Sequence, residues 1–588
     1  MAVLGVWGLA RDSAMGNDEV ATRWAALLSL RELAHLLNTV DAVHGFYYLL
    51  MHGWMAVGTS PEVMRIPSVI AMTAAVAMTA ILARRLTGSG WAALFAGLIM
   101  ALTPTITYYA QTARSYALVV ACVVASTLVL LHALSAETSG AAGARAARRW
   151  VAYGALITLG GYLNEMSLLV LAAHGVTVLL ARYGRRVVRH WLVAGAVGAA
   201  LVLPLVVVST REQGAVAWIS APNLTDFRIL FQDYFGATYL IDVILLACAV
   251  VAVLPPAAWW ERRRASAAAK TGEALPGAAS GDAPVSGDAS VFGSAPASGA
   301  GPVSRAGAAS GAATSGAAAS GAGAEAELPW WRRGGVSLPS VAAPLLVLPA
   351  ALLIGESFIL TPLYVDRYVL YGEVGAALLA GGGMYRIGQW LVDAVARQKP
   401  GAAAGRRKPG GAAGQRKPGG AAGQRKPGGA AGQRSLLWLP GVVVVALTLL
   451  LQLGPQQRVR TPDSRAYNFG GPSRLVGASA RPGDGVLFFG PFFRKARLGY
   501  PQDFTKTSDF AMAESPRQAG NFQGADKPFR LVEPLMLARQ RIWVIGRQPS
   551  PDLATSAFRA ESILLRTNFS LILKRQFRGM VVTLWARH

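Results

Sequence analysis

Four ionisable residues near the start of the chain have the types and spacing to do chemistry: Asp18, Glu19, Asp41 and His44. They stand beside strongly apolar segments, so we expect them in a loop just outside a bilayer. Ionisable groups held at a membrane face are costly and usually carry function. This cluster therefore predicts chemistry on a substrate that is delivered at the membrane surface.

The composition is that of a polytopic membrane protein. Of the 588 residues, 53% are apolar and only 15% are charged, and the apolar residues come in blocks of roughly 15–25, the length that crosses the hydrocarbon core as a helix. Cys122 and Cys248 both lie inside such blocks. They read as small hydrophobes there, and they predict neither a disulfide framework nor a thiol metal site.

The net charge of +25 does not indicate nucleic-acid binding, because no basic face interleaved with aromatic residues accompanies it. The basic clusters instead flank apolar spans, as the positive-inside rule requires. These clusters are Arg84 and Arg85, the segments 145–149, 182–189 and 262–264, and Arg332 and Arg333.

Placing each basic cluster in the cytoplasm gives an N-in, C-out chain with about eleven crossings. The first is a half-span at 1–10, which favours a truncated start, and the external loop 11–62 follows, with a juxtamembrane helix at 45–57. The full spans are expected at 63–83, 89–107, 116–134, 150–165, 167–181, 191–209, 238–260, 337–360, 369–389 and 436–453.

The remaining segments define the domains. Residues 1–260 form the N-terminal membrane module, and further spans lie within 335–390 and 436–454. The Ala/Gly/Ser-rich segment 261–334 and the basic segment 391–435, with its repeated Arg-Lys-Pro-Gly-Gly-Ala-Ala-Gly-Gln unit, are predicted to be disordered cytoplasmic linkers. Residues 455–588 alternate short apolar runs with helical stretches, which predicts an extracytoplasmic α/β domain, including two strands joined at Arg578 and Gly579.

An ordered series of motifs resembles the actinobacterial branch of family 39 glycosyltransferases. This family belongs to the glycosyltransferase C superfamily of membrane enzymes that use polyprenyl-phosphate sugars, and it includes protein O-mannosyltransferases and the lipid A aminoarabinose transferase. The two low-complexity linkers have no counterpart in that pattern. The series comprises Asp18-Glu19, 38–48, 65–68, 109–118, 481–488, Tyr500-Pro501 and 541–544.

The resemblance implies roles for the acidic residues. An acid in the first external loop would act as general base, or orient the acceptor, during inverting attack on the anomeric carbon; this role falls to Asp18, with Glu19 as the alternative. Asp41 and His44 would line the same cavity. Glu165 could line it too, although a helix-capping or solvated role is the favoured reading for this residue. The Asp18-Glu19 pair could likewise only cap a helix that begins at Val20.

A lipid phosphate leaving group needs positive charge nearby. Arg114 is the first candidate, flanked by Tyr116, and the alternative is an interfacial arginine that reaches toward the headgroups. Arg65 could be a second phosphate contact or a structural residue. Arg367 could touch the phosphate or pair with its neighbour Asp366. Related enzymes often carry an Asp near the position of Arg114, so the resemblance leaves a divalent metal open and implies no certain cofactor.

These expectations describe an integral glycosyltransferase of the cell membrane, which transfers a hexose, mannose by preference, from a polyprenyl-phosphate donor to an extracytoplasmic acceptor. Its partners would be that donor, an unidentified acceptor and the bilayer, and not nucleic acid. Two other classes stay open: a lipid or small-molecule transporter or flippase, and a membrane-anchored binding scaffold. Mid-span His174 is expected to be a hydrogen-bonded packing residue rather than a metal ligand.

Overall fold

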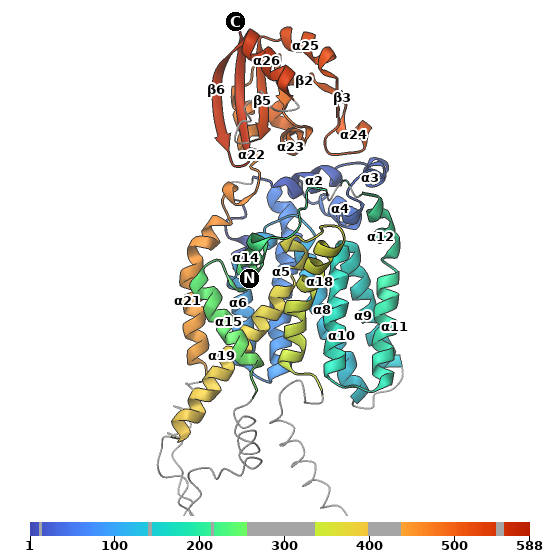
Figure 1. Ribbon diagram of the computed structural model, residues 1–588, viewed down its shortest axis with the longest axis vertical. Coiled ribbons are helices and arrows are strands. Elements are labelled where there is room, and N and C mark those ends of the chain that lie inside the picture. The colour runs from blue at the N-terminus through green and yellow to red at the C-terminus, as the bar shows by residue number, and fades with distance from the viewer. Residues whose placement is uncertain are drawn as a thin grey trace, which may run out of the picture. The chain divides into compact units, whose positions relative to one another are not determined.

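The protein is mostly helical, as a computed structural model shows (Figure 1). The structure describes residues 1–10, 14–138, 144–212, 214, 217–255, 335–397, 437–547 and 558–588. The expected linker 261–334 lies outside these residues, and so does 391–435 apart from its first part. That first part continues the preceding helix to Arg397, so the helix is longer than the expected span 369–389.

Four described helices are long and apolar enough to cross a membrane by length and composition: α5 (Pro61–Thr87), α8 (Tyr116–Thr138), α18 (Leu338–Ile359) and α21 (Leu439–Arg458). The number rises to seven if each of three bent helix pairs counts as one span. The polytopic helical architecture is thereby confirmed, whereas the count of about eleven and the N-in, C-out orientation stay predictions.

Two of the expected spans, 89–107 and 191–209, are divided into bent helix pairs, and a third bent pair joins the segment before residue 238 to the span expected at 238–260. The span 89–107 divides into α6 (Gly90–Leu102) and α7 (Pro104–Ala110), bent by 66°. Thr103 is extended at the break because Pro104 disfavours helical geometry in the residue before it. The other bent pairs are α11 (Arg185–Ala200) with α12 (Leu203–Ser209) and η3 (Thr210–Glu212), at 43°, and α14 (Leu224–Phe235) with α15 (Tyr239–Val253), at 71°.

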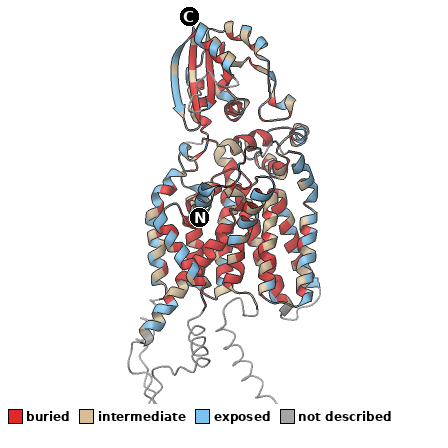
Figure 2. Ribbon diagram, in the orientation of Figure 1, coloured by how far each residue is buried: buried red, intermediate tan, exposed pale blue. Residues whose placement is uncertain are grey.

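The helix α19 (Gly372–Arg397) packs against α15, α6 and α18. Glycines permit these close contacts: a Cβ on Gly383 would lie 1.8 Å from the carbonyl oxygen of Cys248, and one on Gly381 would lie 2.5 Å from the backbone nitrogen of Ala96. Figure 2 shows buried residues along the facing sides of these helices. The remaining helices of this part are α1 (Ala2–Val6), α9 (Ala144–Leu163), η2 (Glu165–Leu169), α10 (Val170–Leu180) and η4 (Asp366–Val369).

The segment expected as the loop 11–62 is largely helical. The expected juxtamembrane helix is present as α4 (Gly45–Trp54), but α2 (Asn17–Ala26), α3 (Leu30–Leu37) and η1 (Ala42–His44) precede it. Each of α2 and α3 begins with a capping box, in which a glutamate at the third helical position reaches back to the backbone N–H of Gly16 or Ser29. The sequence shows the Ser-X-X-Glu signature only for α3, at Ser29 and Glu32, because the N-cap of α2 is a glycine.

The C-terminal part contains a mixed five-stranded sheet in the order β2-β1-β5-β7-β6. Strand β1 pairs in parallel with β2 and β5, whereas β7 pairs antiparallel with β5 and β6. The expected hairpin is confirmed, with Gly579 at φ 72° in its turn. The strands are β1 (Asp484–Phe488), β2 (Thr507–Asp509), β5 (Arg541–Arg547), β6 (Phe569–Phe577) and β7 (Met580–Arg587); β3 (Met512–Glu514) and β4 (Ala525–Asp526) form a separate antiparallel pair.

Short helices join and cover these strands. They are η5 (Pro462–Ser464), α22 (Gly470–Ser479), η6 (Pro491–Arg494), α23 (Lys495–Gly499), η7 (Pro501–Phe504), α24 (Pro516–Ala519), α25 (Phe529–Leu537) and α26 (Arg559–Asn568). Buried Arg494 ties η6 to two strands, because its guanidinium pairs with Asp509 on β2 at 2.7 Å and with Asp526 on β4 at 2.5 Å.

Replacing Arg494 by methionine should destabilise the C-terminal part. The change would leave the buried carboxylate of Asp509 without its cation, which costs about 3–5 kcal/mol. We expect a lower thermal midpoint in detergent and faster proteolysis of this part of the chain. Arg517→Ala, which removes an exposed ion pair with Glu32, is the control and should change little; equal resistance of both variants would contradict the role of Arg494.

Candidate active site

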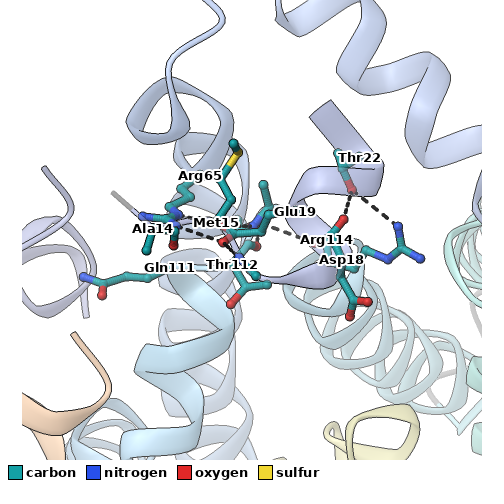
Figure 3. A network of polar contacts seen from close by, with 12 residues as sticks. Ala14, Met15, Asp18, Glu19, Thr22, Arg65, Gln111, Thr112 and Arg114 are labelled. Carbon is teal, nitrogen blue, oxygen red and sulfur yellow. Dashed lines mark hydrogen bonds and ion pairs between the residues drawn. The ribbon is translucent and has the colours of Figure 1, made fainter. Parts of the chain in front are cut away.

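Helix α2 places both predicted carboxylates in its first turn, but it gives them different surroundings (Figure 3). The carboxylate of Glu19 is 2.7 and 2.8 Å from two guanidinium nitrogens of Arg65. It also accepts the backbone N–H of Ala113 at 3.0 Å and lies 3.8 Å from Arg465. Burial alone would raise the pKa of Glu19, yet Arg65 and Arg465 lower it to about 2. Glu19 is thus a buried structural anion whose lone pairs are occupied.

Asp18 is less constrained. Its side chain is half-buried, and Figure 3 shows its carboxylate pointing away from the Glu19 network. Oδ1 accepts one hydrogen bond, from Nδ2 of Asn17 at 3.2 Å. Among the described residues, no basic side chain lies within ion-pair distance of it. Burial would raise the pKa of Asp18, but the charges of Arg114 and Arg367 hold it below its usual value, so the carboxylate is ionised and accessible.

Asp41 and Arg114 form the centre of a second polar group. Asp41, which has a left-handed backbone (φ 66°), accepts a hydrogen bond from the hydroxyl of Tyr48 and lies 3.4 Å from Nη2 of Arg114. Arg114 also donates to Tyr48 at 2.8 Å and to Thr22 at 3.4 Å. Because Thr22 donates to the backbone oxygen of Asp18, this group adjoins the first turn of α2.

His44 completes this group as a neutral imidazole. Burial, followed by the charge of Arg114, lowers the pKa of His44 to about 4, and Nε2 lies 3.8 Å from Asp41. Within the described part of the chain, Nδ1 of His44, Nε of Arg114 and Oγ of Ser115 are buried without a hydrogen-bond partner. Unpaired buried polar atoms are rare in proteins and call for an explanation; here a bound substrate would supply partners.

Of the predicted cations, Arg367 has the fewest hydrogen-bond partners among the described residues. Its Nε donates to the hydroxyl of Tyr116 at 2.9 Å, and its guanidinium lies 5.6 Å from the ring centres of Trp218 and Tyr368. Among the described residues, its two terminal nitrogens have no acceptor. Aromatic rings therefore hold the guanidinium while its donors stay available for an anion.

Two predicted residues have other partners. Arg65 is tied to Glu19 and to the backbone oxygen of Ala14, which favours its structural reading over phosphate contact. Glu165 accepts a hydrogen bond from Ser209 at 2.9 Å, and burial raises its pKa; it is bonded to none of the other predicted residues. His174 lies between Thr127 and Tyr153, at 2.9 and 3.0 Å, as expected for a packing residue.

Sequence reasoning missed three residues of this site. Tyr48 orients Asp41 and Arg114; it was placed only within the expected juxtamembrane helix 45–57. Arg465, from the segment after α21, reaches Glu19, Thr112 and the backbone oxygen of Gln111. Lys495, from α23, donates to Asn17 at 2.7 Å. No local pattern marks either cation, because each depends on chain segments far apart in sequence.

The residues present do not fit a divalent metal. In the described ranges, no group of three or more His, Cys, Asp or Glu residues is arranged to hold an ion. The charges that lower the pKa of Asp18 most are those of Arg114 and Arg367, and for Asp41 they are those of His44 and Arg114, whereas magnesium and calcium sites are built from oxygens.

One family model matches the sequence, over residues 45–209: that of the dolichyl-phosphate-mannose-protein mannosyltransferases. The match includes Arg65, Arg114, Tyr116 and Glu165 but begins after Asp18, Glu19, Asp41 and His44. No curated protein is similar enough to match.

Two solved structures have a similar arrangement over 99% of this chain and 96% of theirs: ArnT from Cupriavidus metallidurans in the apo state and bound to undecaprenyl phosphate. Each is 13% identical to this chain, with a TM-score of 0.47. The family-model match is the finding that confirms the resemblance to membrane glycosyltransferases of the C superfamily.

Proposed function

We propose that this protein transfers a hexose, with inversion, from a polyprenyl-phosphate donor to a hydroxyl on an extracytoplasmic acceptor, and that it acts in the cell membrane. The observation that carries the proposal is the contrast between Glu19 and Asp18. Glu19 forms ion pairs with Arg65 and Arg465. The neighbouring Asp18 is ionised and half-buried, and its side chain accepts a hydrogen bond only from the amide of Asn17 among the described residues. Such a carboxylate is suited to accept a proton from a bound hydroxyl.

In this reaction the acceptor oxygen attacks the anomeric carbon from the face opposite the phosphate. The new bond forms between the acceptor oxygen and that carbon while the carbon–oxygen bond to the phosphate breaks. Asp18 takes the hydroxyl proton, and the bonding pair leaves with the lipid phosphate. Asp41, held by Tyr48 and Arg114, would hydrogen-bond the sugar or the acceptor, with neutral His44 beside it.

Charge on the departing phosphate would be met by the arginines. Arg367 offers two terminal nitrogens that have no acceptor among the described residues, and Arg114 offers its unpartnered Nε. Both guanidiniums are fixed in advance, Arg367 by aromatic rings and Arg114 by Tyr48 and Asp41. Donors held in place before the reaction lower the barrier because they need no reorganisation as charge develops.

The choice of mannose rests on the description of the matching family, whose members use dolichyl-phosphate mannose. A transporter reading lacks support from charge placement, since the described acids and arginines of the site gather at helix ends and loops. A membrane-anchored binding scaffold would not need the ionised carboxylate of Asp18, which has no counterion at ion-pair distance among the described residues. Sugar transfer accounts for both features.

Asp18→Asn should abolish most sugar transfer while leaving the protein folded. The amide cannot take the acceptor proton, so we expect a loss of about 10²–10⁴ in rate. The measurement is transfer of radiolabel from polyprenyl-phosphate mannose in membranes that contain either protein. Equal transfer by both proteins would remove Asp18 from the role of base.

Glu19→Gln is the matched control at the neighbouring residue, and it should reduce the stability of the protein more than its activity. It leaves Arg65 and Arg465 buried without their counterion, which costs about 3–5 kcal/mol. We expect a low yield of folded protein, but transfer per folded molecule well above that of Asp18→Asn. The low pKa of Glu19 also predicts that its contribution to stability is complete above about pH 4.5 and is lost as the pH falls toward 2. A folded, inactive Glu19→Gln protein would contradict this assignment.

Arg367→Gln should weaken donor use specifically. Losing a charged hydrogen bond to phosphate costs about 1.5–3 kcal/mol, so we expect the KM for the donor to rise by about 10- to 100-fold. Tyr116→Phe removes the hydroxyl that orients Nε and should have a smaller effect in the same direction. Unchanged donor KM in both variants would show that the phosphate binds elsewhere.

A further inference from the structure

The C-terminal part of the chain reaches the proposed base through one lysine. Nζ of Lys495, at the start of α23, donates to Oδ1 of Asn17 at 2.7 Å. The same amide donates through Nδ2 to Oδ1 of Asp18 at 3.2 Å. Two consecutive hydrogen bonds therefore connect a residue of the C-terminal part to the carboxylate that would take the acceptor proton.

Lys495 occupies an unusual place for a lysine. Only 8% of the residue is exposed, and its ammonium lies 4.9 and 5.3 Å from the ring centres of Phe492 and Phe522. Among the described residues, no carboxylate lies within ion-pair distance of it. Burying an ammonium group costs free energy, so a methionine would fill this space at a lower cost. The hydrogen bond to Asn17 is an interaction that a methionine could not make.

We infer that Lys495 is a positioning residue for the proposed transfer: acting through Asn17, it fixes the orientation of Asp18 and supplies positive charge to the site. This inference rests on the proposed function and adds to it that the site is incomplete without the C-terminal part. Asn17 cannot rotate freely, because one side of its amide is held by an ammonium donor and the other side must then present its N–H groups to Asp18.

The charges of the site support this assignment. The charges of Arg114, Arg367 and Lys495 all lower the pKa of Asp18, and of these three cations Lys495 is the one that the C-terminal part supplies. Removing it would take one positive charge from the surroundings of Asp18.

The protonation state of Lys495 is open to measurement. Burial lowers the pKa of Lys495 to about 8. The charges of Asp18 and Asp41 oppose this shift, and the charge of Arg114 adds to it. The other groups packed against it are the uncharged Asn17, Phe492 and Phe522. The ammonium form therefore predominates at neutral pH and is lost as the pH rises through about 8.

The test compares pH profiles of sugar transfer, per folded molecule, in membranes that contain the full-length protein or its Lys495 variants. Wild type should lose activity as the pH rises through about 8. Lys495→Met should reduce kcat at pH 7 by about 10-fold or more, as misplacement of a reacting group does, and should show no such decline. Lys495→Arg should keep most activity at pH 7 and move the decline above pH 9, since guanidinium stays charged.

Two further variants separate positioning from general damage. Asn17→Ala removes the relay but keeps the ammonium, and it should lower kcat while the alkaline decline persists. Lys527→Gln is the control, because Lys527 lies in the same part of the chain and donates only to the backbone oxygen of Phe510; activity and pH profile should be unchanged.

The outcomes distinguish this inference from the proposed function. No transfer by wild type would overturn the proposed function itself. Transfer that is lost in Asp18→Asn but is unchanged, in rate and pH profile, in Lys495→Met would overturn the inference alone. An alkaline decline that persists unaltered in Lys495→Arg would also overturn it.

Discussion

The buried ion cluster at Glu19 is the interaction on which the rest of the site depends. One carboxylate joins α2 to α5 through Arg65, to the segment before α8 through the N–H of Ala113, and to the segment after α21 through Arg465. Adjacent residues on a helix point about 100° apart. Fixing Glu19 in this cluster therefore turns Asp18 toward Arg114. Because the arginines pair with Glu19, the carboxylate of Asp18 stays available to a substrate hydroxyl in the proposed reaction.

Sequence patterns predicted the parts of the structure that depend on local composition. Apolar blocks marked the long helices, and short apolar runs marked β1, β5, β6 and β7. Other features depend on pairing between distant segments, and no local pattern contains them. The sequence alone does not show which of Asp18 and Glu19 is paired with arginines. Arg65, 46 residues from Glu19 in the chain, and Arg465, about 450 residues from it, both pair with Glu19, and Asp18 has no ion-pair partner among the described residues. The break at Thr103 was readable in part, because Pro104 marks it.

The electrostatics of the site combine two opposing effects. Burial disfavours every charge here, and without compensation it would raise the pKa values of Asp18 and Asp41. The positive charges of Arg114 and its neighbours reverse this, so the pKa values of both acids lie below their usual range, whereas burial and Arg114 keep His44 neutral. A site that keeps carboxylates ionised beside arginines and a lysine would suit the proposed reaction, in which a hydroxyl must lose a proton and a phosphate must gain charge.

The first turn of α2 is also held from the side of α23. The backbone N–H of Met15 donates to the hydroxyl of Tyr500 at 2.7 Å, Arg23 donates to the backbone oxygen of Gly499 at 3.4 Å, and Lys495 donates to Asn17. A Cβ on Gly499 would lie 2.8 Å from the side chain of Val20, so only glycine permits this approach. The arginines fix Glu19 from one side and α23 fixes Asn17 from the other, and Asp18 lies between these two anchors. A change in the contact between α2 and α23 would act directly on the orientation of Asp18, the proposed base, and on the inference drawn from Lys495 the C-terminal part is a component of the site.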